Sequence, residues 1–131
     1  YTLAGTLQDK IDDAPDIPGQ FQGLLSAQVE RAFAFADEVA GDPAQEDKAR
    51  MATNALYHAA SAVLLAWEGA TVGAAGGDAR RLLLSRMVVD NRLLPQDPLA
   101  AGENRFAKAA ATLLLQDDPV PLAQVRDTLA L

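Results

Sequence analysis

The sequence predicts an all-α protein: an antiparallel bundle of about four helices, with an irregular N-terminal arm and a short C-terminal helix. Three observations indicate this class. Apolar residues recur at steps of three and four over long stretches. Glycine, proline and aspartate separate these stretches. No segment alternates apolar and polar residues between hairpin turns, as a half-buried strand would.

The chain of 131 residues is long enough for one hydrophobic core without help from metals or disulfides. Residues 1–19 are predicted as an arm or linker, because the segment 12–16 (DDAPD) and Pro18-Gly19 interrupt any periodicity. Residues 20–131 form the predicted bundle domain. Its first helix begins at Gln20 and ends at Gly41. The apolar face of this helix consists of Phe21, Leu25, Val29, Ala32, Phe33, Ala36 and Val39.

A helix start signal follows at Asp42, which is expected to be the N-cap of a long second helix over 43–75. Pro43 suits the first helical position, and Gln45 can close a capping box. Gly76-Gly77 is expected to end this helix. Small residues dominate its apolar face, as they do in the predicted fourth helix, which suggests close approach between helices.

Three further helices complete the predicted bundle. Asp78 is expected to cap a third helix over 79–94, which Pro95 ends. A fourth helix is predicted over 103–115 and a short last one over 121–129. Between them, Asp97-Pro98 can begin a further turn, Gly102 interrupts, and Asp117-Asp118-Pro119 stops the fourth helix.

Composition excludes several classes of function. A net charge of −7 argues against nucleic acid and anionic membranes as partners, because those need clustered lysine and arginine. The absence of cysteine excludes disulfides, thiolate metal sites and a thiol nucleophile; it fits a reducing cytoplasm, where we expect the protein. The weakly charged run 51–77 carries His58 and Glu68, so a buried helix suits it better than a membrane span. The chain opens on Tyr1 and not on Met, which suggests an upstream segment or domain.

The one histidine, His58, offers little chemistry. A di-iron bundle needs Glu-x-x-His pairs, and Ala55 stands three residues before His58. A histidine phosphotransfer domain is an alternative, but it needs a nearby lysine and glycine that the following residues lack. A core or interface histidine is the preferred interpretation. The glycine-rich segment 73–77 lacks the lysine and the strand of a phosphate-binding loop, and it is predicted to be a helix end and turn.

Arg86 and Asp90 stand four residues apart on the predicted third helix and can form an ion pair. A solvated pair is the simplest interpretation, and a contact with a neighbouring domain is the alternative. Arg80, Arg81, Arg86 and Arg92 are expected to lie on solvated faces of that helix. Candidate interface residues are Tyr57, His58, Trp67, Arg86 and Asp90.

The segment 54–96 carries a family resemblance. It opens with Asn54-Ala55 and Tyr57, continues through an apolar run containing Trp67, turns at Gly76-Gly77 and ends in the sequence Leu-Leu-Pro-Gln at 93–96. In this order of features it resembles the extra C-terminal helical domain of a subset of bacterial acyl-CoA dehydrogenases. The match covers about a third of the chain, and the tail after Pro98 has no firm counterpart in the family.

The resemblance implies a parent enzyme of fatty acid metabolism that uses FAD to take two hydrogens from the α and β carbons of an acyl-CoA. The flavin site and the catalytic base would lie in an upstream core, so this segment would be an accessory domain, not catalytic by itself. It would pack on its own dehydrogenase core or on a second subunit. A free-standing helical interaction domain is the alternative.

Glu68 is the one candidate catalytic residue, because some acyl-CoA dehydrogenases carry their base in a similar aromatic-Glu-Gly segment followed by Thr. Here Trp67-Glu68-Gly69 lies inside a continuous helical pattern with apolar residues on both sides. In those enzymes the base lies at a loop or a helix end that faces the flavin, and this sequence shows no flavin-binding partner segment. We therefore expect Glu68 to be an ordinary helix residue with an ionic or polar partner.

Overall fold

The computed structural model describes residues 2–97, 99 and 104–131, and within these ranges the chain is all-α, as predicted. Six α-helices and two short helical segments of other types follow one another, and the described residues form no strand. In chain order the elements are α1 (Leu3–Asp13), α2 (Gly19–Ala40), the 3-10 segment η1 (Pro43–Lys48), α3 (Ala49–Ala74), α4 (Arg80–Val88), the π-helical segment η2 (Val89–Leu93), α5 (Arg105–Leu115) and α6 (Leu122–Leu129).

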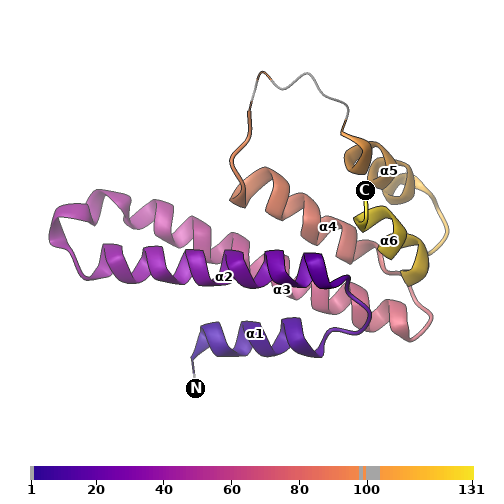
Figure 1. Ribbon diagram of the computed structural model, residues 1–131, viewed down its shortest axis with the longest axis horizontal. Coiled ribbons are helices and arrows are strands. Elements are labelled where there is room, and N and C mark those ends of the chain that lie inside the picture. Colours follow the sequence, from indigo (N-terminus) through magenta and orange to yellow (C-terminus); the bar gives the residue numbers. More distant parts are fainter. Residues whose placement is uncertain (1, 98, 100–103) are drawn as a thin grey trace.

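The two longest helices, α2 and α3, run antiparallel and form a hairpin with η1 at its tip (Figure 1). Helix α3 is the central element, since α1, α2, α4 and α6 all contact it. Helix α1 lies along the inner half of the hairpin, and α5 and α6 pack beside α4 at the opposite end from the tip (Figure 1). None of the helices among the described residues combines the length and hydropathy needed to cross a membrane.

The prediction of an irregular arm over residues 1–19 is wrong, because the helix α1 occupies most of this segment. Thr2 caps this helix: its hydroxyl oxygen accepts a hydrogen bond of 3.1 Å from the Gly5 N–H. Leu7 and Ile11 lie one helical turn apart and are buried in the same core as residues of α2 and α3. The acidic, proline-containing stretch that suggested an arm is only the end of α1 and the turn before α2, with Asp16 at a φ of 57°.

The predicted helix over 43–75 is divided at its first turn. Asp42 is its N-cap as predicted, accepting a hydrogen bond of 3.0 Å from the Ala44 N–H. Gln45, however, has a φ of −104° and a ψ of 16°, and its side-chain amide donates to the Asp42 carboxylate at 3.1 Å. This local pairing holds the turn as the separate segment η1, and the α-helix begins at Ala49.

The small residues of the second and fourth predicted helices suggested close approach between helices. For the second helix, α3, such an approach occurs with α4. A Cβ added at Gly69 would lie 2.3 Å from the backbone nitrogen of Leu82, so only glycine fits there. The hydroxyl of Ser85, which is fully buried, donates a hydrogen bond of 2.5 Å to the Ala62 carbonyl on α3. Small residues on α3 therefore let the two backbones meet, and a serine links them inside the core.

Helix α3 ends where Gly76-Gly77 was predicted to end it. Gly76 adopts a φ of 88°, and the Gly77 N–H donates to the Val72 carbonyl at 2.9 Å, a glycine C-cap. The predicted helix over 79–94 is α4 followed by η2, in which Leu94 N–H bonds the Val89 carbonyl five residues back. Leu94 itself is extended, because the residue before a proline avoids helical geometry.

The two last helices agree with the predicted ones within a few residues. Asn104 caps α5 by accepting a hydrogen bond of 2.9 Å from the Ala107 N–H. Helix α6 begins after Pro121 and buries Val125 and Leu129. The predicted start of the fourth helix at Glu103, the interruption at Gly102 and most of the turn predicted at Asp97-Pro98 lie outside the described residues.

Candidate protein-interaction surfaces

The candidate residues from the sequence do not form one site. Tyr57, His58 and Glu68 line the outer surface of α3, while Trp67 faces α1. Arg86 and Asp90 lie between α4 and the C-terminal helices. The structure thus brings together three of the candidates and places the others in contacts within the bundle.

The first surface, called the α3 face here, is a shallow hollow of about 490 Å³ between α3 and the segment 88–92. The Tyr57 and His58 rings meet edge to face, with centroids 5.3 Å apart and planes at 72°. Tyr57 is 67% exposed and Leu64 is 43% exposed. The lining residues are Tyr57, His58, Ser61, Leu64, Leu65, Glu68, Val88 and Arg92.

Glu68 forms an ion pair with Arg81 of α4, with its Oε2 atom 3.5 Å from the arginine Nε. Both side chains are about half exposed, so the pair is solvated and adds little stability. On α4, Leu84 and Val88 follow Arg81 at helical spacing and continue the same side of that helix. Leu84 is 38% exposed. Glu68 therefore lies in a hollow whose apolar lining comes from both helices, with Leu64 and Leu65 from α3 and Val88 from α4.

Trp67 lies on the other side of α3, where α1 covers it. The Lys10 ammonium of α1 lies 3.6 Å from the centroid of the Trp67 ring, a cation–π contact. The ring also packs against the main hydrophobic core. Trp67 is therefore engaged by a helix of this chain that the sequence prediction had treated as an arm.

Arg86 and Asp90 form the predicted ion pair, with 3.4 Å between the arginine Nε and the carboxylate. Its surroundings differ from the expected solvated face. Arg86 also donates a hydrogen bond of 2.8 Å to the Leu129 carbonyl of α6 and lies 4.0 Å from the centroid of the Phe106 ring of α5. This arginine links α4 to both C-terminal helices.

The expectation of a solvated position is also wrong for Arg80, which reaches the last turn of α5 and the loop that follows it. Its guanidinium donates to the carbonyls of Leu113 at 3.2 Å and of Asp118 at 2.7 Å, and to that of Gln116. The partners lie more than thirty residues along the chain, so no local pattern could have indicated them. Of the four arginines, Arg81 and Arg92 are exposed as expected.

Asp78, which was predicted to cap α4, lies one residue before the N-cap of that helix, which is Ala79, and it completes the connection to the C-terminal segment. Its Oδ1 accepts hydrogen bonds of 3.1 Å from the Arg80 N–H and from the Val120 N–H, and Oδ2 pairs with the Arg80 guanidinium at 3.3 Å. Burial tends to raise the pKa of Asp78, but the two N–H donors and the charge of Arg80 outweigh it and hold the pKa below its ordinary value.

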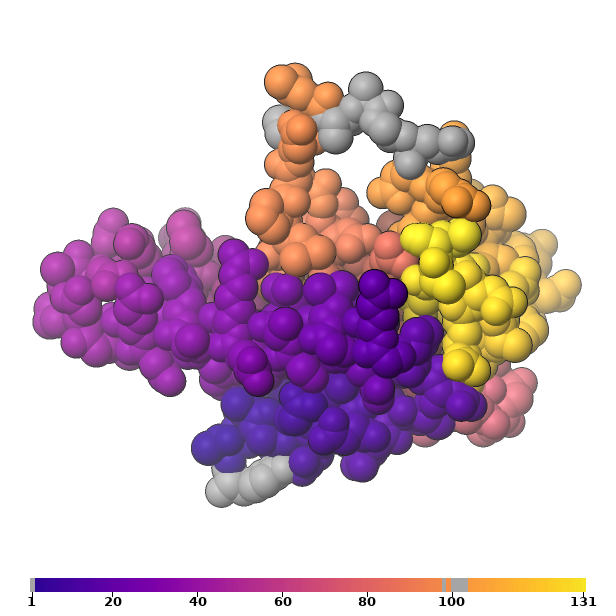
Figure 2. Space-filling view, viewed as in Figure 1, coloured from indigo at the N-terminus to yellow at the C-terminus, as the bar shows by residue number. Residues whose placement is uncertain are grey.

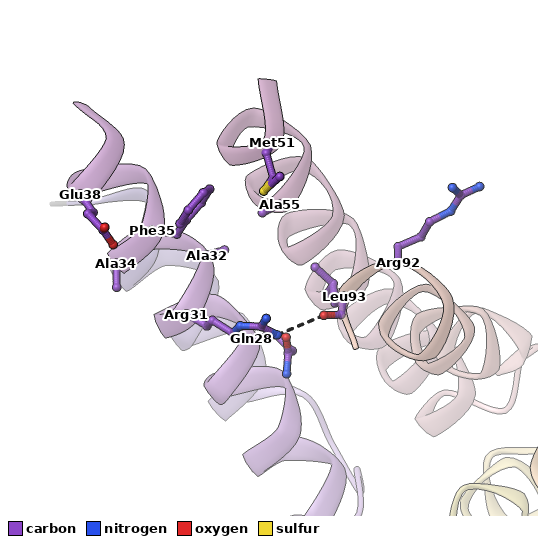
Figure 3. Close-up of a pocket in the computed structure, with 10 residues that line it drawn as sticks. All are labelled: Gln28, Arg31, Ala32, Ala34, Phe35, Glu38, Met51, Ala55, Arg92 and Leu93. Atoms are coloured by element: carbon purple, nitrogen blue, oxygen red, sulfur yellow. Dashed lines mark hydrogen bonds between the residues drawn. The ribbon is translucent and has the colours of Figure 1, made fainter. Parts of the chain in front are cut away.

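A second surface, which the sequence prediction missed, is a groove between α2, the start of α3 and η2 (Figure 3). It has a volume of about 430 Å³. We call it the α2 groove; it is lined by Gln28, Arg31, Ala32, Ala34, Phe35, Glu38, Met51, Ala55, Arg92 and Leu93. Arg31 crosses it and donates a hydrogen bond of 3.2 Å to the Leu93 carbonyl (Figure 3). The available signal was a second helical stripe on α2 at Arg31, Ala34, Phe35 and Glu38.

The comparisons with known proteins leave the family open. No protein-family model, curated protein or solved structure matches this chain. Within the described residues, no group of three or more histidine, cysteine or acidic side chains could hold a metal ion. The glycine-rich segment 73–77 forms the C-terminal end of α3, where the N–H groups of Ala75, Gly76 and Gly77 donate to carbonyls of the last turns of the helix.

Proposed function

We propose that this chain is an accessory helical docking domain of an FAD-dependent acyl-CoA dehydrogenase, packing on the catalytic core or on a partner subunit through its α3 face. The observation that carries the docking role is the exposure of two large residues, Tyr57 and Leu64, in the hollow of the α3 face. Contiguous apolar surface that stays exposed marks contact sites. The identity of the parent enzyme rests on the resemblance of the segment 54–96 to the family's extra C-terminal domain.

The composition of the α3 face suits a protein partner. Tyrosine supplies a large rigid ring with a polar end, the kind of side chain enriched at the energetic centres of interfaces. Around the apolar centre lie His58, Glu68 and the exposed guanidiniums of Arg81 and Arg92. An apolar centre with a polar rim is the usual anatomy of a protein interface.

A catalytic role for this chain alone has less support. Glu68 lies inside α3, about two turns before its end, and its carboxylate is paired with Arg81 at the surface. Such a group lacks the burial that would prepare it as a general base. In this proposal the flavin, the base and the acyl-CoA all belong to the upstream core, and the role of this domain is to bind that core.

The test uses the full-length reading frame that contains this sequence. We expect the purified protein to be yellow, with a flavin absorption spectrum, and to reduce an electron-accepting dye when supplied with an acyl-CoA. Deleting residues 1–131 of the present sequence should alter stability or subunit assembly and leave the flavin spectrum of the core in place. A colourless full-length protein without acyl-CoA-dependent activity would overturn the dehydrogenase assignment and leave a free-standing interaction domain.

A further inference from the structure

The tip of the α2–α3 hairpin is less covered than the rest of the molecule. Toward the tip of the hairpin, the buried residues of the main hydrophobic core end at Val29 on α2 and at Ala62 on α3. Beyond these residues the two helices pack mainly on each other, through the buried Ala32, Val39 and Ala52. In the space-filling view this part of the hairpin projects beyond the other helices (Figure 2).

Two packed helices alone bury little apolar surface, and stable helical proteins add further helices to such a layer. The projecting part also exposes apolar groups, because Met51 is 62% exposed and lines the α2 groove together with Phe35 and Leu93. The α2 groove therefore resembles a surface on which a further helix would pack.

The charges in the α2 groove indicate what would fill it. Arg31 lies at the inner end and Glu38 at the outer end of the groove, as Figure 3 shows. They are seven residues apart on one face of α2, a separation of about 10 Å along the helix axis. Ala34 and Phe35 lie midway between them on the same stripe.

Two antiparallel copies of this helix face would have complementary charges. If a second α2 crosses antiparallel with Ala34 near a two-fold axis, Arg31 of each copy faces Glu38 of the other. A two-fold interface requires this reciprocity, since each contact occurs twice. The small Ala34 at the crossing would let the helix backbones approach, as small residues do between α3 and α4 of this chain.

We propose that the occupant of the α2 groove is a second copy of this chain, with the two hairpins pairing as an antiparallel four-helix bundle. Phe35, Met51 and Leu93 supply the apolar contacts, and the two Arg31–Glu38 pairs set the antiparallel direction. Electrostatic complementarity of this kind fixes register and orientation more than affinity. The α2 groove shares only Arg92 with the α3 face, and the inference does not depend on the identity of the parent enzyme.

The test is the mass of the chain in solution, measured by sedimentation equilibrium over a range of concentrations up to about 1 mM, which detects even weak specific association. We expect a monomer–dimer equilibrium. Because each substitution changes two contacts, Arg31→Glu or Glu38→Arg alone should raise the dimer Kd about tenfold. The double variant, in which both charges are exchanged, should recover most of the wild-type affinity.

The double variant distinguishes pairing from damage to the fold. Both residues have a hydrogen bond within the monomer, since Arg31 donates to the Leu93 carbonyl and Glu38 accepts from the Gln45 side-chain amide at 3.2 Å. Each single substitution removes one of these bonds, and the second substitution would not restore it. Asp127→Arg, an exposed change of equal charge on α6, should leave the Kd unchanged. A wild-type chain that stays monomeric overturns the inference, as does a double variant no tighter than the single ones; neither result bears on flavin in the full-length protein.

Discussion

Gly69 of α3 lies directly against the backbone of Leu82 on α4: a Cβ at position 69 would be 2.3 Å from the Leu82 nitrogen. Backbone atoms of a helix cannot move aside as a flexible side chain can. The short distance between α3 and α4 therefore requires a glycine, which has no side chain, at position 69. This contact lies at the centre of the bundle.

Replacing Gly69 by alanine should lower the free energy of unfolding by about 2–3 kcal/mol, because the added methyl group forces α3 and α4 apart. Urea denaturation followed by circular dichroism measures the change. The matched control is Gly23→Ala on α2, where an added Cβ meets no atom within 4 Å. That substitution should raise stability by about 0.5–1 kcal/mol through helix propensity. Equal effects at both positions would contradict the close contact.

Arg86 should behave as an internal link and Arg81 as a surface residue, although both belong to α4 and both form ion pairs. Arg86→Met removes the contacts with the Leu129 carbonyl and the Phe106 ring, so we expect a loss of about 2 kcal/mol. Arg81→Met removes a solvated pair, and we expect a loss within about 0.5 kcal/mol.

Hydrogen exchange locates the effect of these two arginine substitutions. Arg86→Met should increase exchange in α6, because the link to its last turn is lost, while Arg81→Met should leave α6 unchanged. If Arg86→Met left both stability and α6 exchange unaltered, Arg86 would have to be reassigned to an intermolecular role.

Asp78 should make stability depend on pH in the acid range. Its folded pKa lies below the value of about 3.9 expected in the unfolded chain, so the ionised carboxylate stabilises the fold above that value. This contribution is lost as the pH falls through the folded pKa. Asp78→Asn should therefore unfold with a flatter dependence on pH below about 5. Asp127→Asn, which removes an exposed carboxylate of α6, should keep the wild-type slope.

The sequence was sufficient for those parts of the fold that depend on local signals. Asp42 marks a helix start as an N-cap, Gly76 marks a helix end with its left-handed backbone, and Pro95 marks another because it lacks an N–H. Each of these effects acts within a few residues. The helix α1 was missed because its apolar face is short and its end is acidic. Its formation depends on burial of Leu7 and Ile11 against helices far along the chain.

The candidate surfaces were predictable only in part, for the same reason. Tyr57 and His58 could be grouped because they are neighbours, and Arg86 and Asp90 because they are one turn apart. Which face each residue occupies depends on which helices cover α3 and α4. Trp67 faces α1, and Arg80 reaches the end of α5 and the loop after it, more than thirty residues away; neither contact has a local signature.

The docking role of the α3 face is tested most directly by measuring how tightly this chain binds the remaining core of its full-length protein, by isothermal titration calorimetry. We expect Leu64→Asp to weaken binding about tenfold or more, because a charge would be buried at the centre of the interface. Two control substitutions place the same charge at exposed apolar residues outside the α3 face: Met51→Asp in the α2 groove and Leu115→Asp on α5. Both should leave the affinity for the core unchanged. Binding unaffected by Leu64→Asp, or no binding by the wild-type chain, would contradict the proposal.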